Sequence, residues 1–148
     1  MKTRLLLGIL FASVLPLSAL AKGGPVVVLP GTTHWTAITT GAMAGAQMAV
    51  LLGNPAKSGP YIIRVKVKDG TKFATHYHSE LENVTVISGT LMIGAGDKMD
   101  KSKMVAIPAG GFVSVPPNFH HYAMARGETV IQIDAMGPRT MVPVMHGK

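Results

Sequence analysis

The stretch from Thr75 to Gly89 reads THYHSELENVTVISG and holds side chains that can bind a metal ion. His76 and His78 stand one residue apart, and side chains two positions apart on a β-strand point to the same face. Two adjacent imidazoles suit an apolar core poorly and a divalent ion well. Glu82 follows four residues after His78 and adds a carboxylate. This mixed nitrogen and oxygen set predicts a site for one divalent transition metal ion, such as Fe, Mn, Ni or Zn.

The same residues belong to a longer pattern with fixed spacing. Gly70 is followed after five residues by His76-Tyr77-His78, then after three residues by Glu82, and after six more by Gly89. This pattern matches the first sequence motif of the cupin superfamily at every specified position. The chain therefore resembles the cupins.

A second motif of the same family should follow farther along the chain. Gly110 leads after five residues to Pro116, and His121 then takes the place of the histidine in this motif. Asn118 stands where the motif has glycine, and asparagine tolerates a left-handed turn better than most residues do. Ala125 replaces the asparagine of the motif. The second motif is thus altered, but its metal-binding position keeps a histidine.

The resemblance implies an all-β fold, a double-stranded β-helix or jelly-roll barrel, with the metal ion inside it. It implies His76, His78, Glu82 and His121 as the ligands, with one or two coordination positions open for water, substrate or dioxygen. Glu82 is also our candidate catalytic base. Cupins include dioxygenases, isomerases, epimerases, sugar binders and storage proteins, and a fold alone does not choose among activities. We predict a dioxygenase-like oxidoreductase acting on a small oxygen-rich molecule; the alternative is a non-enzymatic periplasmic binding module for an anion or a sugar.

Two neighbours compete for the predicted positions. Glu80 shares the strand face of His78, but the motif spacing favours Glu82. His120 and His121 point to opposite faces of a strand, so only one of them can face the ion, and the motif favours His121.

Other side chains are assigned from local patterns. His34 and Trp35 precede the motifs and are interpreted as a packed N-terminal clasp. Gln132 lies between Ile131 and Ile133, so it faces opposite to them and enters the barrel only if those two pack against an outer layer. The remaining large apolar candidates are assigned to the core: Tyr61, Met92 and Phe112.

The elements that must hold these residues are short strands. Apolar and β-branched runs are separated by Gly, Pro or Asn, as in β-sandwiches and barrels. We predict strands over Gln47–Leu51, Tyr61–Val67, Asn83–Ser88, Thr90–Ile93, Val105–Ile107, Phe112–Val115, His121–Ala125 and Thr129–Asp134. Gly89 is taken to break one strand, and the tail after Gly137 is interpreted as an extended arm.

The first 21 residues have the pattern of a secretory signal peptide. Lys2 and Arg4 precede an apolar run over residues 5–17, and Ala19-Leu20-Ala21 fits a cleavage site. The run is shorter than the roughly 20 residues that span a bilayer. We therefore expect a single cupin domain over residues 22–148 with an N-terminal arm, located in the periplasm or secreted, without a stable membrane anchor.

Composition narrows the partners and the chemistry. The 148 residues contain no cysteine, which excludes thiolate ligands and cysteine nucleophiles. The formal net charge is +7, but the basic residues are scattered and aromatic residues are few, so no nucleic-acid partner is expected. We expect a small-molecule ligand or substrate. A homodimer is also expected, because the edges of jelly-roll sheets need covering and the arm from Lys22 to Thr40 could reach a partner.

Overall fold

The computed structural model describes residues 24–29 and 31–145, so the expected signal peptide lies outside the described residues. The described chain consists of strands and two short 3-10 helices, and it contains no helix long and apolar enough to cross a membrane. The elements are β1 (Thr36–Ala37), η1 (Gly41–Met43), β2 (Gln47–Leu52), β3 (Gly59–Val67), β4 (Lys72–Tyr77), β5 (Glu82–Ala95), η2 (Lys101–Lys103), β6 (Val105–Pro108), β7 (Phe112–Val115), β8 (His121–Gly137) and β9 (Val142–Pro143).

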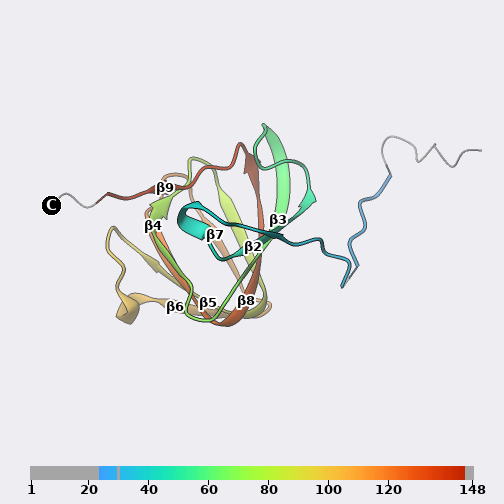
Figure 1. Cartoon of the computed structure of the whole chain (residues 1–148). Helices are drawn as coiled ribbons and strands as arrows, with labels where there is room; N and C mark the ends of the chain where they lie inside the picture. Colours follow the sequence, from blue (N-terminus) through green and yellow to red (C-terminus); the bar gives the residue numbers. More distant parts are fainter. Residues whose placement is uncertain (1–23, 30, 146–148) are drawn as a thin grey trace, which may run out of the picture.

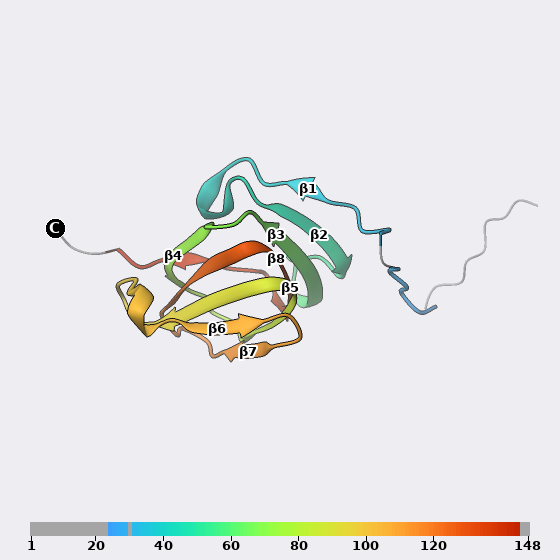
Figure 2. The ribbon, with the colours of Figure 1, turned by 90° about the horizontal axis from the view of Figure 1, so that it is seen from below.

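Two long strands, β5 and β8, organise the barrel. They pair antiparallel over most of their lengths, from Glu82 opposite Ala135 to Ala95 opposite His121. The first half of β5 also pairs with β7 and its second half with β6, while β8 pairs with β4 near its start and with β3 along the rest. The chain thus wraps into the all-β jelly roll that was predicted, with β5 to β7 on one side and β2 and β3 on the other (Figures 1 and 2).

The two long strands bend where the sequence analysis expected strand breaks. Gly89 and Gly127 have φ angles of +74° and +76°, a backbone region that glycine enters without strain. The pairing of β5 with β8 shifts register on either side of Ser88. The prediction that Gly89 separates two strands, Asn83–Ser88 and Thr90–Ile93, was therefore wrong, because both belong to β5. A glycine bulge lets a strand turn a barrel corner and continue its ladder.

The core follows the period-2 pattern of the strands. Tyr61, Ile63, Val65 and Val67 on β3 are buried, with their half-exposed neighbours between them. The prediction of a core position is confirmed for Tyr61, whereas Met92 is only half-buried. For Phe112 it was wrong, because this side chain is 59 % exposed on the short strand β7.

The first and last strands of the described chain, β1 and β9, both join the sheet. The indole ring of Trp35 lies 4.5 Å from the Lys66 ammonium nitrogen, and the following strand β1 pairs with β2. The tail after Gly137, interpreted from sequence as an extended arm, returns to the barrel. Its strand β9 pairs with β4, where Pro143 lies opposite His76. The C-terminal segment therefore covers the end of the barrel that holds the histidines.

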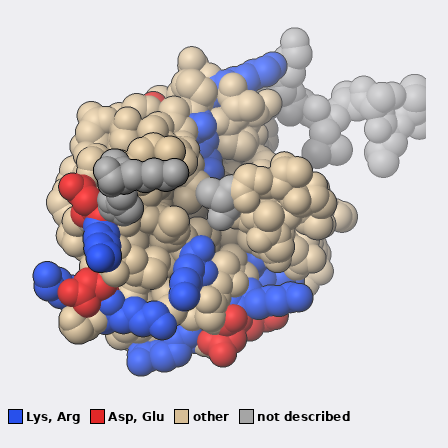
Figure 3. All heavy atoms as spheres, turned by 60° about the vertical axis from the view of Figure 1, so that its left-hand side comes forward, with Lys and Arg blue, Asp and Glu red and all other residues tan. Residues whose placement is uncertain are grey.

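The charged side chains form no continuous band on the face shown in Figure 3. Most of the Lys, Arg, Asp and Glu side chains lie in the lower half of this view, and the upper half is mainly uncharged. The two signs are mixed there, so no patch of a single sign stands out on this face.

Candidate metal centre

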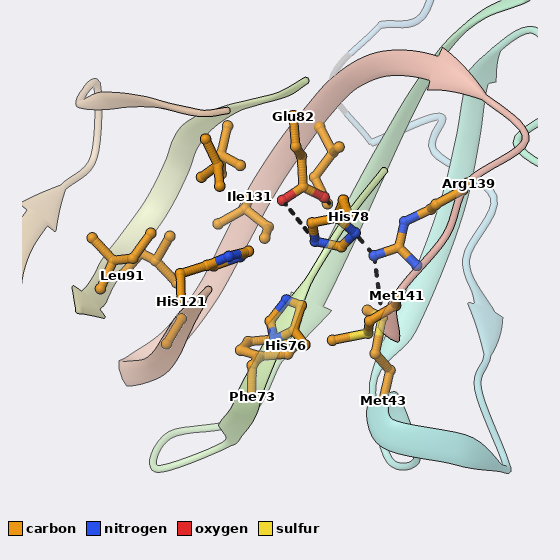
Figure 4. Close-up of a pocket in the computed structure, with 15 residues that line it drawn as sticks. Met43, Phe73, His76, His78, Glu82, Leu91, His121, Ile131, Arg139 and Met141 are labelled. Atoms are coloured by element: carbon orange, nitrogen blue, oxygen red, sulfur yellow. Dashed lines mark hydrogen bonds and ion pairs between the residues drawn. The ribbon is translucent and has the colours of Figure 1, made fainter. Parts of the chain in front are cut away.

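The predicted metal-binding residues come from three separate parts of the chain. His76 lies in β4, His78 directly follows that strand, Glu82 begins β5 and His121 begins β8. The pairing of β4 with β8 sets His76 opposite His121. All four side chains point into one pocket inside the barrel, as Figure 4 shows.

Three histidines converge closely enough to share one ion. His76, His78 and His121 each offer a ring nitrogen, and these nitrogens all lie within 4.8 Å of one another. The three residues are only 4–6 % exposed. This group could therefore bind a metal ion away from bulk water.

Backbone carbonyls fix the orientation of all three rings. Nδ1 of His76 lies 2.6 Å from the Ala74 carbonyl oxygen, and Nδ1 of His121 lies 3.0 Å from that of Phe119. Nδ1 of His78 contacts the Thr140 carbonyl oxygen. A carbonyl only accepts, so each Nδ1 is the N–H donor and each Nε2 is left for the pocket. Metal-binding histidines are typically held this way by their second nitrogen.

Glu82 lies beside the histidine group. Its Oε2 is 3.3 Å from His78 Nε2, and its Oε1 is 4.0 Å from Nη2 of Arg139. Within the described chain, His78 Nε2 and Glu82 Oε1 are both buried without a hydrogen-bond partner. Buried polar atoms without partners are costly, and a cation between them would satisfy both. The residues present thus fit a divalent ion, although Glu82 does not lie within the cluster of three nitrogens.

Burial sets the charge of the group. It lowers the pKa of His76 to about 4 and also lowers that of His121, so both rings are neutral at pH 7. Burial pushes the pKa of His78 down as well, but the Glu82 carboxylate and the Thr140 carbonyl outweigh it and the pKa is raised above 6.5. Burial would raise the pKa of Glu82, yet His78 and Arg139 hold it below 4.5. Glu82 is therefore a carboxylate at neutral pH.

Apolar side chains form most of the pocket wall. The pocket is small, with about 40 Å³ open to the centres of water-sized molecules, and its charged lining residues are Glu82 and Arg139. The other non-histidine lining residues are Met43, Phe73, Val84, Leu91, Ile93, Val115, Ala123, Ile131, Ile133 and Met141. Arg139 and Met141 belong to the tail and were not singled out from the sequence, since no local pattern there indicates a return to the barrel.

The competing residues lie outside the pocket. Glu80 is half-buried and accepts hydrogen bonds from the hydroxyls of Ser79 and Thr140. His120 Nδ1 lies 2.6 Å from Asp97 Oδ1, and its ring stacks on Tyr77. Both placements agree with the choice of Glu82 and His121.

Two further candidates are also placed away from the histidines. Gln132 accepts a hydrogen bond from Nε of Arg64 at 3.1 Å, while its neighbours Ile131 and Ile133 line the pocket. The sequence left open whether Gln132 or its two isoleucine neighbours face the interior. The structure shows that the isoleucines do, and Gln132 points out of the barrel. His34 is exposed and does not line the pocket.

Comparison with known proteins identifies the fold. No protein-family model matches the sequence, and no curated protein matches it. The polyketide cyclase RemF from Streptomyces resistomycificus is similar in structure, with a TM-score of 0.66 and 12 % sequence identity over 82 % of this chain and 87 % of RemF. An RmlC-like cupin from Shewanella frigidimarina matches with a TM-score of 0.58 and 17 % identity over 76 % of this chain and 91 % of the other. KdgF from a Halomonas species matches with a TM-score of 0.57 and 18 % identity over 76 % of this chain and 92 % of KdgF.

These likenesses and the strand pairing define a jelly-roll barrel, and in this chain three histidines line its interior. The fold is that of the cupin superfamily, as the two sequence motifs implied.

Metal binding should depend on pH through His78. Its Nδ1–H faces the Thr140 carbonyl, so the proton that raises its charge sits on Nε2, where the ion would bind. Its pKa is raised above 6.5, whereas His76 and His121 are already neutral at pH 7. We expect Zn(II) affinity to increase with pH, by up to about tenfold per unit below the pKa of His78, and then to level off. Calorimetry in buffers of different ionisation enthalpy should show proton release near pH 6.5, and pH-independent affinity between pH 6 and 8 would contradict this account.

Proposed function

We propose that the protein is a metal-dependent enzyme that acts on a small oxygen-rich molecule inside the barrel. The observation that carries the proposal is the arrangement of three carbonyl-anchored imidazoles around unpartnered buried atoms of His78 and Glu82. His76, His78 and His121 would hold the ion, and Glu82 would complete the set.

The chain's own residues would supply positioning, a base and a dry site. A bound divalent ion would polarise a substrate oxygen and, if redox-active, exchange electrons with dioxygen. The carbonyl contacts of the three Nδ1 atoms keep the rings from rotating. Glu82 is ionised at neutral pH and can accept a proton from a substrate hydroxyl. Apolar walls exclude water and so strengthen these electrostatic interactions.

The proposed reaction class is dioxygenase-like oxidation of an enol or a catechol. Neutral imidazoles with a carboxylate form a donor set that accepts Fe(II). The test compares Fe(II)-loaded, Zn(II)-loaded and metal-free protein on catechols, flavonols, enols and keto-sugars, with dioxygen uptake and product mass measured together. We expect uptake and product with Fe(II) only. Loss of turnover in a Glu82→Ala protein that still binds Fe(II), but not in Glu80→Ala, would support Glu82 as the base.

Other outcomes of the same experiment identify other functions. Turnover by both the Fe(II) and Zn(II) forms without dioxygen uptake would indicate a redox-neutral reaction. The polyketide cyclase RemF, which is similar in structure, is an example of an enzyme with this fold that is named for a cyclisation. Saturable binding without product across the panel would favour a periplasmic binding module for an anion or a sugar. Turnover that survives complete metal removal would exclude the metal-centred mechanism.

We also propose export to the periplasm. The pattern of residues 1–21 supports cleavage after Ala21, which would leave Lys22 as the first residue. Expression of the sequence in a bacterial host should give a periplasmic protein whose intact mass is that of a chain beginning at Lys22. A recovered mass that includes residues 1–21 would contradict the proposal.

A homodimer remains our proposal for the assembly. Val26, Val27 and Leu29 are well exposed in the N-terminal arm, and apolar side chains of this kind are often covered by a partner. We expect light scattering to give twice the chain mass at micromolar concentration. Deletion of residues 22–34 should then give a monomer, and a monomeric full-length protein would exclude the dimer.

A further inference from the structure

The tail places one arginine against the candidate metal centre. Arg139 follows β8, and its backbone N–H donates to the Pro55 carbonyl oxygen at 2.6 Å. The next residue, Thr140, accepts the His78 Nδ1–H through its carbonyl and the Ser79 N–H through its hydroxyl oxygen at 2.9 Å. The backbone is thus held on both sides, and the guanidinium projects into the pocket from the side opposite His121 (Figure 4).

The guanidinium of Arg139 has few partners there. Its Nη2 donates a weak hydrogen bond to the Met43 sulfur at 3.6 Å and lies 4.0 Å from Glu82 Oε1, beyond the 2.7–3.2 Å of an N–H···O hydrogen bond. Its Nε is buried and, within the described chain, has no hydrogen-bond partner. Arginines that serve only as counter-ions of a carboxylate commonly engage it with two short hydrogen bonds. Arg139 instead keeps donors available to a third group.

The charge of the pocket also calls for an anion. The charged residues that line it, Glu82 and Arg139, are of opposite sign and lie 4.0 Å apart. A divalent ion held by the histidines would leave the pocket with a net charge of about two positive units, in an apolar surrounding that strengthens electrostatic attraction. An anionic ligand would balance that charge.

We infer that Arg139 binds a carboxylate of the substrate, so that the substrate is a small organic acid rather than a neutral sugar or phenol. The guanidinium would take the carboxylate in a two-point contact, and an adjacent oxygen of the acid would face the histidines. This inference rests on the proposed function and narrows its substrate class. It also gives a partner to the buried Nε, which has none within the described chain.

Matched pairs of acids and esters test the inference without turnover. The probes are pyruvate with methyl pyruvate and 3,4-dihydroxybenzoate with its methyl ester, titrated by calorimetry into the redox-inert Zn(II) form. Wild-type protein should bind each acid at least about tenfold more tightly than its ester, which corresponds to about 1.4 kcal/mol. Arg139→Gln should abolish this preference, and Arg139→Lys, which keeps the charge but loses the planar fork, should retain only part of it.

The control is Arg126→Gln, which removes the same charge from an exposed position outside the pocket. This variant should keep the preference for acids. Wild-type protein without that preference would overturn the inference whether or not Arg139→Gln folds, and so would an Arg139→Gln protein that keeps it. Zn(II) titration of the same samples separates the two proposals. If wild-type protein does not bind Zn(II), the proposed function fails, while acid preference in metal-free protein that is lost in Arg139→Gln would still support a carboxylate site.

Discussion

Replacing His121 with alanine is expected to lower the affinity of the protein for Zn(II) by about 100-fold or more. The change removes one of three buried ring nitrogens that lie within 4.8 Å of one another. Even the loss of a residue that only orients a metal ligand typically costs about 10- to 100-fold in affinity, and His121 would itself be a ligand. Competition with a chelator of known affinity measures the change.

His120→Ala is the matched control, because it removes the adjacent imidazole from the chain. His120 binds Asp97 and stacks on Tyr77, and it does not line the pocket. Its replacement should change Zn(II) affinity by less than about threefold, since no ligand or ligand-orienting contact is lost. If His120→Ala abolished binding and His121→Ala did not, the assignment of the second motif would be wrong.

Much of the site follows from the sequence because its determinants are local. The alternation of a strand sets His76 and His78 on one face, and both are buried. The same alternation separates His121, which is buried, from His120, which is half-buried. Simple alternation does not separate Glu80 from Glu82, because both share the parity of His78, and the chain leaves β4 after Tyr77, so that the turn breaks the parity. The spacing of the motif favours Glu82, which lines the pocket, whereas Glu80 does not.

The rest of the pocket depends on contacts between distant parts of the chain. Arg139 and Met141 reach the histidines only because β9 pairs with β4, some 65 residues earlier. Met43 lies on η1, near the start of the described chain, and also lines the pocket. The sequence around these residues has no periodicity that reports such pairing. Gln132 was undecided for a related reason, since alternation sets two faces apart but does not say which one is inside.

The predicted strand boundaries at the glycines were wrong for a different physical reason. Glycine with positive φ ends many strands, but in a barrel it also makes the corners through which strands continue. Gly89 in β5 and Gly127 in β8 are of the second kind, because the β5–β8 ladder resumes beyond both. Only the pairing partner distinguishes a corner from an end.

The second large expected effect concerns the stability of the fold at the Gly89 corner. Gly89→Ala is expected to lower the free energy of unfolding by roughly 3 kcal/mol. The φ of +74° costs a residue with a Cβ about 1–2 kcal/mol. An added Cβ would also lie 2.4 Å from the Glu128 carbonyl oxygen and 2.9 Å from the Thr129 Cα, so the backbone must move, and overpacking of this kind costs about 1–3 kcal/mol. Urea denaturation measures the change.

Gly127→Ala separates the two contributions. Gly127 has nearly the same φ, +76°, but a Cβ there meets no atom within 4 Å, so only the cost of the backbone angle, about 1–2 kcal/mol, should appear. Thr129 cannot easily move aside for a side chain at Gly89, because it is fully buried and its hydroxyl donates to the Thr90 carbonyl at 3.2 Å while accepting the Thr90 N–H at 3.3 Å. Equal losses in the two variants would show that β5 and β8 can separate at this corner, and the close packing of Gly89 would then not be what holds the bend.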